Sequence, residues 1–245
     1  MKSTIFTLTL LLLCGGFLCA QPKAASEPKV VAKMNEPLRL PVWSPDGSQL
    51  ALTSLKNNGI WVVSKDGSNL RQVSSEAGAG YRMQWSDNAT VAAKSPLKSS
   101  NSLLQQMMDA PADVASQTPA LQSFSDYLVF NPVLSPKGDQ IVFQVSNGKG
   151  LYICNTDGSD LRSLGKGERA TWTPDGKYIV VMLTEDDGEV VTKGELVSIH
   201  VTSGSRNTLL SSDKYIALSP AISPDGKKLA FEEYTSGAIY VMDIK

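Results

Sequence analysis

Short apolar runs separated by polar turns recur along the chain, and one phrase marks each recurrence. The phrase is an apolar residue, Ser or Thr, Pro, Asp and Gly, followed after two more residues by Leu or Ile. Complete copies stand at residues 43–47, 172–176 and 222–226, and weaker copies stand at 134–138 and 85–88. Five copies at a spacing of 38 to 50 residues indicate a repeat architecture.

The pattern inside each repeat predicts four short antiparallel strands. An apolar strand ends at the phrase, and the Ser-Pro-Asp-Gly order is typical of a type I turn, because Pro suits its second position and Gly its fourth. A buried strand such as 50–52 follows, then an alternating strand such as 60–63. An Asp-Gly hairpin signal precedes a short polar strand such as 70–73, which suits an outer edge. Units of about 45 residues with four strands are typical of β-propeller blades.

We therefore expect an all-β chain folded as a β-propeller of four-stranded antiparallel blades. The last repeat ends after its third strand, and residues 29–33 read as an outer strand ahead of the first repeat. This arrangement predicts five blades, with the N-terminal strand completing the last blade. Six blades follow instead if the irregular insert at 96–125 hides another one. That insert contains the apolar stretch 103–108 and is either a pair of modified strands with a long loop or a short helix.

The first twenty residues have the pattern of a secretory signal peptide. A basic start precedes the apolar run 5–13, and Ala20 suits the cleavage position, so residues 1–20 are expected to be removed. The alternative is a lipoprotein signal that anchors the protein to the outer membrane through Cys14 or Cys19. We expect residues 21–27 to be a short linker and 28–245 to form the propeller of an exported, periplasmic protein. Cys154 then remains as a small buried hydrophobe.

Three stretches, 43–51, 222–231 and 60–68, resemble the propeller repeats of the TolB family, which also occur in prolyl-oligopeptidase-like enzymes. The resemblance covers nearly the whole chain after the signal peptide and is specific for the fold. It implies a protein of the bacterial periplasm that binds partner proteins of the cell envelope. The additional N-terminal domain of TolB has no counterpart here, so we expect a stand-alone TolB-like propeller.

Composition and motifs argue against several chemistries. The net charge of −1 shows no basic excess of the kind that nucleic-acid binding needs. The chain has no Gly-x-Ser-x-Gly elbow, and its single histidine, His200, falls near the end of a third strand. The acidic stretches 155–160 and 185–189 read as solvated hairpins rather than calcium loops. We therefore expect a monomer that is not an enzyme and has no cofactor and no metal.

The strand order places the connections of variable length on one face of the propeller, where binding residues usually lie. Aligning the repeats there exposes a ring of polar and aromatic side chains at the mouth of the central channel. The expected binding residues are Arg39, Tyr81, Arg82, Phe130, Asn131, Glu168 and Arg169. They predict an exported, non-catalytic scaffold that docks an envelope protein or peptide. The alternatives are a propeller that binds a glycan or another small ligand, and a degenerate relative of a propeller enzyme.

Overall fold

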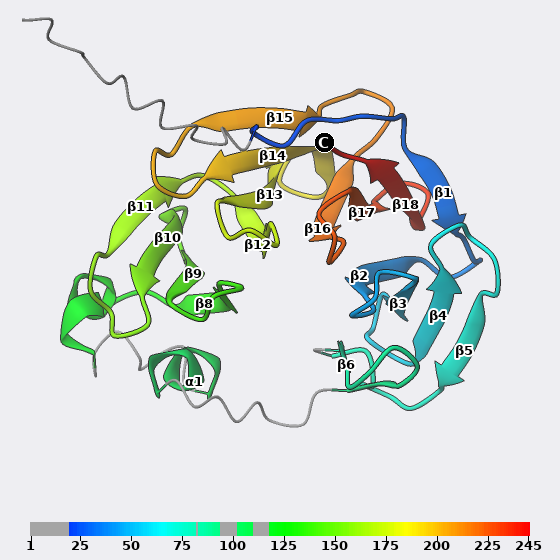
Figure 1. Ribbon diagram of the computed structural model, residues 1–245, viewed down its shortest axis with the longest axis horizontal. Coiled ribbons are helices and arrows are strands. Elements are labelled where there is room, and N and C mark those ends of the chain that lie inside the picture. The colour runs from blue at the N-terminus through cyan, green and yellow to red at the C-terminus, as the bar shows by residue number, and fades with distance from the viewer. Residues whose placement is uncertain (1–19, 82, 94–101, 110–117) are drawn as a thin grey trace, which may run out of the picture.

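The computed structural model describes residues 20–81, 83–93, 102–109 and 118–245. Figure 1 shows these residues as antiparallel sheets that radiate from a central opening, with the first strand of each sheet nearest the centre. This is the all-β, propeller-like arrangement that the repeats predict. None of the helices in these ranges is long and apolar enough to cross a membrane. The expected signal peptide, with Cys14 and Cys19, lies outside the described residues apart from Ala20.

Four complete four-stranded sheets are present among the described residues. The first holds β2 (Leu38–Trp43), β3 (Gln49–Ser54), β4 (Ile60–Ser64) and β5 (Arg71–Ser74). The second holds β8 (Val129–Leu134), β9 (Gln140–Val145), β10 (Gly150–Asn155) and β11 (Arg162–Gly165). The third holds β12 (Glu168–Trp172), β13 (Tyr178–Asp186), β14 (Val191–His200) and β15 (Arg206–Leu210). The fourth holds β16 (Ala217–Ile222), β17 (Lys228–Glu233), β18 (Ala238–Asp243) and β1 (Lys29–Ala32).

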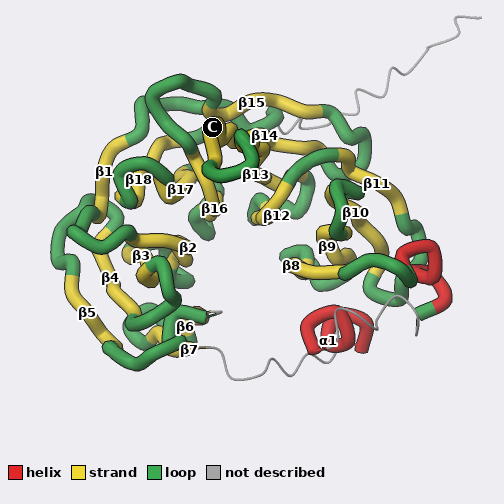
Figure 2. The backbone as a smooth tube through the Cα atoms, turned by 180° about the vertical axis from the view of Figure 1, so that it is seen from behind, coloured by secondary structure: helices red, strands yellow, loops and turns green. Residues whose placement is uncertain are grey.

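The second repeat departs from this plan. Its described residues form only the two-stranded sheet of β6 (Met83–Trp85) and β7 (Val91–Ala93), followed by α1 (Ser102–Asp109) and a 3-10 helix (Pro119–Phe124). Of the two structures expected for the insert, the short helix is therefore correct. Figures 1 and 2 both show α1 in the ring between β6 and β8. With four complete sheets and one partial sheet described, the blade count of five or six stays a prediction.

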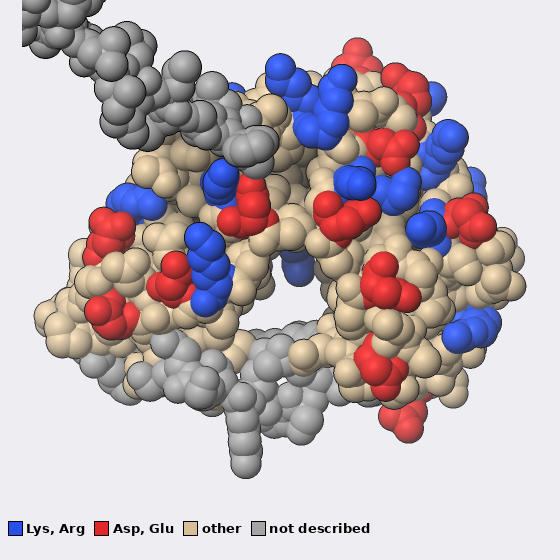
Figure 3. All heavy atoms as spheres, viewed as in Figure 1, with Lys and Arg blue, Asp and Glu red and all other residues tan. Residues whose placement is uncertain are grey.

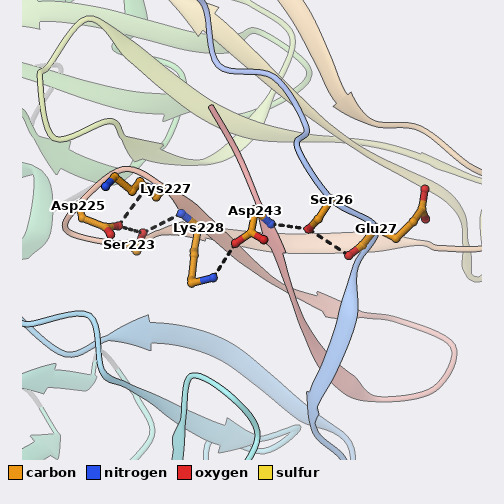
Figure 4. A network of polar contacts seen from close by, with 7 residues as sticks. All are labelled: Ser26, Glu27, Ser223, Asp225, Lys227, Lys228 and Asp243. Carbon is orange, nitrogen blue, oxygen red and sulfur yellow. Dashed lines mark hydrogen bonds and ion pairs between the residues drawn. The ribbon is translucent and has the colours of Figure 1, made fainter.

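The N-terminal strand completes the last sheet, as the repeat pattern predicts. β1 pairs antiparallel with β18, and Val31 and Ala32 are buried against the first and last sheets. Figure 4 shows the polar network beside this junction: the Asp243 N–H donates to Ser26 Oγ at 2.8 Å, and Lys228 Nζ lies 2.6 Å from Asp243 Oδ1. The ion pair with Lys228 holds the pKa of the Asp243 carboxyl below its usual value.

Residues 21–27, expected to be a linker, make specific contacts with the same part of the molecule. The backbones of Lys23 and Lys245 exchange two hydrogen bonds, each 2.9 Å long. Asn207 Nδ2 donates to the Pro22 carbonyl at 2.8 Å, and Pro22 is buried. Residues 21–27 therefore follow the edge of the third and fourth sheets. The domain boundaries expected from the sequence stay a prediction.

The phrase itself forms the turn that its residue order predicts. In the first repeat the Gly47 N–H donates to the Ser44 carbonyl at 2.9 Å, which closes a four-residue turn. Ser44 Oγ donates to Asp46 Oδ1 at 2.7 Å and accepts from the Gln49 N–H at 3.0 Å. The Ser or Thr hydroxyl thus joins the turn to the next strand, and the same bonds recur at Thr173 and Ser223.

The core consists of apolar clusters that each span two neighbouring elements of the ring. Second strands supply their centre, and Leu50, Ile141, Ile179 and Leu229 are fully buried. One cluster joins the second and third sheets, another joins the third and fourth, and another joins the fourth and first. Leu103, Leu104 and Met107 of α1 pack against apolar residues of the second sheet. Burial of this apolar area between sheets is the main stabilising term of such a fold.

Candidate functional site

The innermost strand of each four-stranded sheet carries a bulge at the same place. The residue three positions before the first residue of the phrase has a positive φ although it is not glycine: Leu40 (53°), Asn131 (49°), Arg169 (50°) and Ser219 (50°). The strand register shifts at each of these sites. Left-handed backbone at non-glycine residues costs free energy, and it is retained where surrounding contacts hold it. These residues form part of the wall of the central channel.

Contacts from the preceding sheet hold the bulges at Leu40 and Arg169. Glu232 on β17 accepts from the Leu40 N–H at 3.1 Å and from Arg39 Nε at 3.1 Å. Gln144 on β9 accepts from the Arg169 N–H at 3.2 Å and from Asn131 Nδ2 at 2.7 Å. These two acceptors occupy the same position in their second strands. A polar residue at the fifth position of a second strand therefore bridges two sheets at the channel wall.

The channel wall encloses a cavity of about 640 Å³ that opens toward the variable connections. Figure 3 shows that the centre of the molecule is hollowed and that its face carries both signs of charge. The cavity size lies within the range of about 300–1,000 Å³ that is usual for small-ligand sites. The polar side chains that line it are Arg39, Asn57, Tyr81, Asn131, Arg169 and Ser219. Val42, Met83 and Met108 supply apolar wall.

The two arginines in this cavity differ in how they are held. Arg39 forms an ion pair with Glu232, whose side chain is only 4% exposed. Among the described residues, the guanidinium of Arg169 has no hydrogen-bonding or ion-pair partner, although its backbone is fixed by Gln144. An arginine with a fixed backbone and an unpaired guanidinium can bind a carboxylate or phosphate through two parallel hydrogen bonds. The guanidinium of Arg169 is therefore available to an anionic group.

A second hollow, a groove of about 550 Å³, adjoins the central cavity between the second and third sheets. Asn131 and Arg169 line both spaces. The long β13–β14 hairpin, whose turn lies between Asp186 and Val191, forms one wall of the groove. The registers of these two strands stay paired from Tyr178 opposite His200 to Asp186 opposite Val191.

The expected binding residues fall into three groups. Arg39, Tyr81, Asn131 and Arg169 line the cavity. Phe130 and Glu168 line the groove instead, and Arg82 lies outside the described residues. Glu232 and Gln144 were missed because they belong to second strands, which were read as core. The sequence feature that could have identified them is a polar residue inside an otherwise apolar second strand.

Other chemically reactive side chains have ordinary structural surroundings. The His200 ring packs edge-on against Tyr178, and its Nδ1 lies 2.9 Å from Ser203 Oγ within one turn. Burial raises the pKa of the Cys154 thiol to about 12, so this cysteine is the buried hydrophobe that was expected. The described residues contain no group of three or more His, Cys, Asp or Glu side chains placed to hold a metal ion.

Comparison with known proteins adds likeness of fold only. No protein-family model matches the chain, and no curated protein matches it. One similar solved structure is the β-propeller domain of the Trilobed protease from Pyrococcus furiosus, with 17% identity and a TM-score of 0.38 over 48% of this chain and 39% of that one. A second is an oligogalacturonate lyase in complex with manganese, with 16% identity and a TM-score of 0.35 over 89% of this chain and 51% of that one. A third is a candidate gluconolactonase, with 12% identity and a TM-score of 0.39 over 89% and 92%.

These matches contradict the prediction of a non-catalytic scaffold that docks an envelope protein. Two of the three similar structures are described as enzymes, so neither the scaffold nor the statement that the protein is not an enzyme is retained. The chain spans about half of the lyase's length and less of the protease propeller. At these identities the likeness assigns no reaction to this chain.

Proposed function

We propose that the central cavity binds a small anionic ligand, with a carboxylated sugar as the best-fitting class. The observation that carries this proposal is the guanidinium of Arg169, which faces a 640 Å³ cavity without a partner among the described residues. A charged group left unpaired in such a site gains from a ligand that supplies the opposite charge. The proposal corresponds to a ligand-binding propeller rather than to a protein-docking scaffold.

The remaining lining supports a ligand that carries hydroxyl groups as well as charge. Asn57, Asn131 and Ser219 offer amide and hydroxyl groups that both donate and accept hydrogen bonds. Met83 and Val42 offer apolar surface for the carbon faces of a ring. A few convergent polar groups on a partly apolar wall are typical of small-ligand sites.

The test is calorimetric titration of the chain without residues 1–20 with a panel of uronic acids and neutral sugars. Arg169→Asn removes the guanidinium but suits the local backbone, because Asn131 occupies the equivalent position at positive φ. Its matched control is Arg71→Asn on the outer strand β5, where the side chain is exposed. We expect uronic-acid binding that Arg169→Asn weakens about tenfold to a hundredfold and Arg71→Asn leaves unchanged. Equal binding by both variants would overturn the proposal.

The finer assignments made from the sequence belong to the same proposal. The repeat phrases support a stand-alone TolB-like propeller, and the apolar run 5–13 with Ala20 supports export to the periplasm. The proposal concerns binding and does not assume that the protein is inactive. Bound ligands should therefore also be followed over time for chemical conversion.

A further inference from the structure

The geometry points to a linear ligand: we propose that the protein binds an acidic oligosaccharide, with one sugar in the central cavity and the following sugars in the groove between the second and third sheets. This inference rests on the proposed function and adds the chain-like character of the ligand. The two hollows adjoin each other, and Asn131 and Arg169 line both. A ligand that meets Arg169 in the cavity therefore has a continuous path into the groove.

The junction between the two hollows is held in place by one buried side chain. Gln144 is 6% exposed, and its Oε1 accepts from Asn131 Nδ2 at 2.7 Å and from the Arg169 N–H at 3.2 Å. The backbone at Asn131 and Arg169 is left-handed, with φ of 49° and 50°. A ligand would meet both side chains on a preorganised wall, which reduces the entropy lost on binding.

The groove carries three basic and three acidic side chains, and two of the basic ones remain available to an anionic chain. Lys193 is engaged by Glu195 at 2.9 Å and by Glu185 at 3.7 Å. The hydrogen bonds from Ser211 and Lys193 hold the pKa of the Glu195 carboxyl below its usual value, so this pair stays ionised. Among the described residues, the side chains of Lys166 and Arg169 have no partner, against the single unpaired carboxylate of Glu168.

The uncharged lining of the groove suits sugars. The amides of Asn131, Gln144 and Asn147 and the hydroxyls of Ser146 and Thr184 can bond with ring hydroxyls. Phe130 supplies an aromatic surface at the same place, on which the apolar face of a sugar ring can pack. The groove volume of about 550 Å³ adds to the cavity a space of similar size, so the combined site exceeds what a single sugar fills.

The experiment is a length series, from uronic-acid monomer to hexamer, titrated against the chain without residues 1–20. Neutral glucan oligosaccharides of the same lengths serve as the ligand control. Lys166→Ala is the groove variant, and Lys177→Ala is its match, an exposed lysine at the turn face beside Asp175. We expect the affinity of the native protein for the acidic oligosaccharides to rise at least about tenfold with ligand length, equal to about 1.4 kcal/mol, and then to level off.

The variants separate this inference from the proposed function. Lys166→Ala should flatten the length dependence while leaving monomer affinity unchanged, and Lys177→Ala should change neither. Monomer binding that depends on Arg169 but shows no gain with length would overturn the linear ligand and keep the proposed function. Absence of binding at every length would overturn both. A length gain for neutral and acidic chains alike would overturn the acidic class.

Discussion

The indole Nε1 of Trp43 donates a 2.9 Å hydrogen bond to the backbone carbonyl of Ala221, one sheet away in the ring. Trp85 makes the same bond to the carbonyl of Val42 at 3.0 Å, and Trp172 to that of Val133 at 3.2 Å. Each acceptor lies one residue before the first residue of its own phrase. The tryptophan of the phrase therefore fastens its sheet to the preceding one.

Replacing Trp43 by Phe should lower the free energy of unfolding by about 1–3 kcal/mol more than the loss of ring volume alone, because the Ala221 carbonyl loses its buried donor. Trp61→Phe is the matched control, since Trp61 is similarly buried and its indole N–H has no hydrogen-bonding partner among the described residues. Urea unfolding of both variants measures the difference. Equal losses would show that the hydrogen bond contributes nothing beyond packing.

Removal of residues 29–33 should destabilise the protein by several kcal/mol. The deletion removes β1, which leaves the edge of β18 unpaired and exposes apolar surface that Val31 and Ala32 cover. Thermal unfolding followed by circular dichroism reports the change. An unchanged melting temperature would mean that β1 does not complete the last sheet in solution.

Ser219→Gly should leave stability unchanged or raise it by up to about 1 kcal/mol, because glycine relieves the cost of a φ of 50°. The control is Ser198→Gly, a buried serine on β14 outside the set of positive-φ residues. It should lose about 0.5–1 kcal/mol from the backbone alone, and more because its hydroxyl donates to the Asn207 carbonyl. Chemical unfolding compares the two. A larger loss at Ser219 than at Ser198 would show that the bulge carries no backbone strain.

The acid limb of the stability profile should depend on Glu233. Burial raises the pKa of its carboxyl, but hydrogen bonds from Ser236, Thr235 and Ile216 outweigh burial, so the folded-state pKa lies below the ordinary value of 4.5. Its stabilising contribution is therefore complete above pH 4.5 and is lost as the pH falls through the folded-state pKa.

Glu233→Gln should reduce the fall in unfolding free energy between about pH 5 and pH 3, where this linkage acts. Urea titrations at several pH values in that interval measure the slope. Glu189→Gln, on an exposed hairpin tip, serves as the control and should keep the native slope. A native slope in the Glu233 variant would show that its hydrogen bonds do not survive in solution.

The strands and turns could be predicted because the contacts that form them are local. The Ser44 hydroxyl, the Asp46 carboxylate and the Gly47 N–H bond within five residues of one another, so the phrase contains all the groups its turn needs. The weaker copy at residues 134–138 follows the same rule. At Ser135 the Asp is replaced by Lys137, and Asp139 supplies the carboxylate instead, 2.7 Å from the serine hydroxyl.

The candidate site could be predicted only in part because its decisive contacts join different sheets. Arg39 and Arg169 were expected at the channel mouth from alignment of the repeats, and both line the cavity. Their different states depend on Glu232 and Gln144, which lie 193 and 25 residues away in sequence. No periodicity in one repeat shows whether a side chain of another repeat neutralises an arginine. The groove likewise depends on the length of the β13–β14 hairpin.

The bonds from Trp43 to Ala221, from Trp85 to Val42 and from Trp172 to Val133 all run in one direction, each from a sheet to its predecessor. Each sheet thus offers one surface to its predecessor and a different surface to its successor, which is a heterologous, head-to-tail interface. The outcome of such an interface depends on the rotation that it imposes between neighbours. The number of blades around the axis therefore depends on the rotation between neighbouring sheets. The repeated sequence phrase, which builds the single blade, does not determine that number.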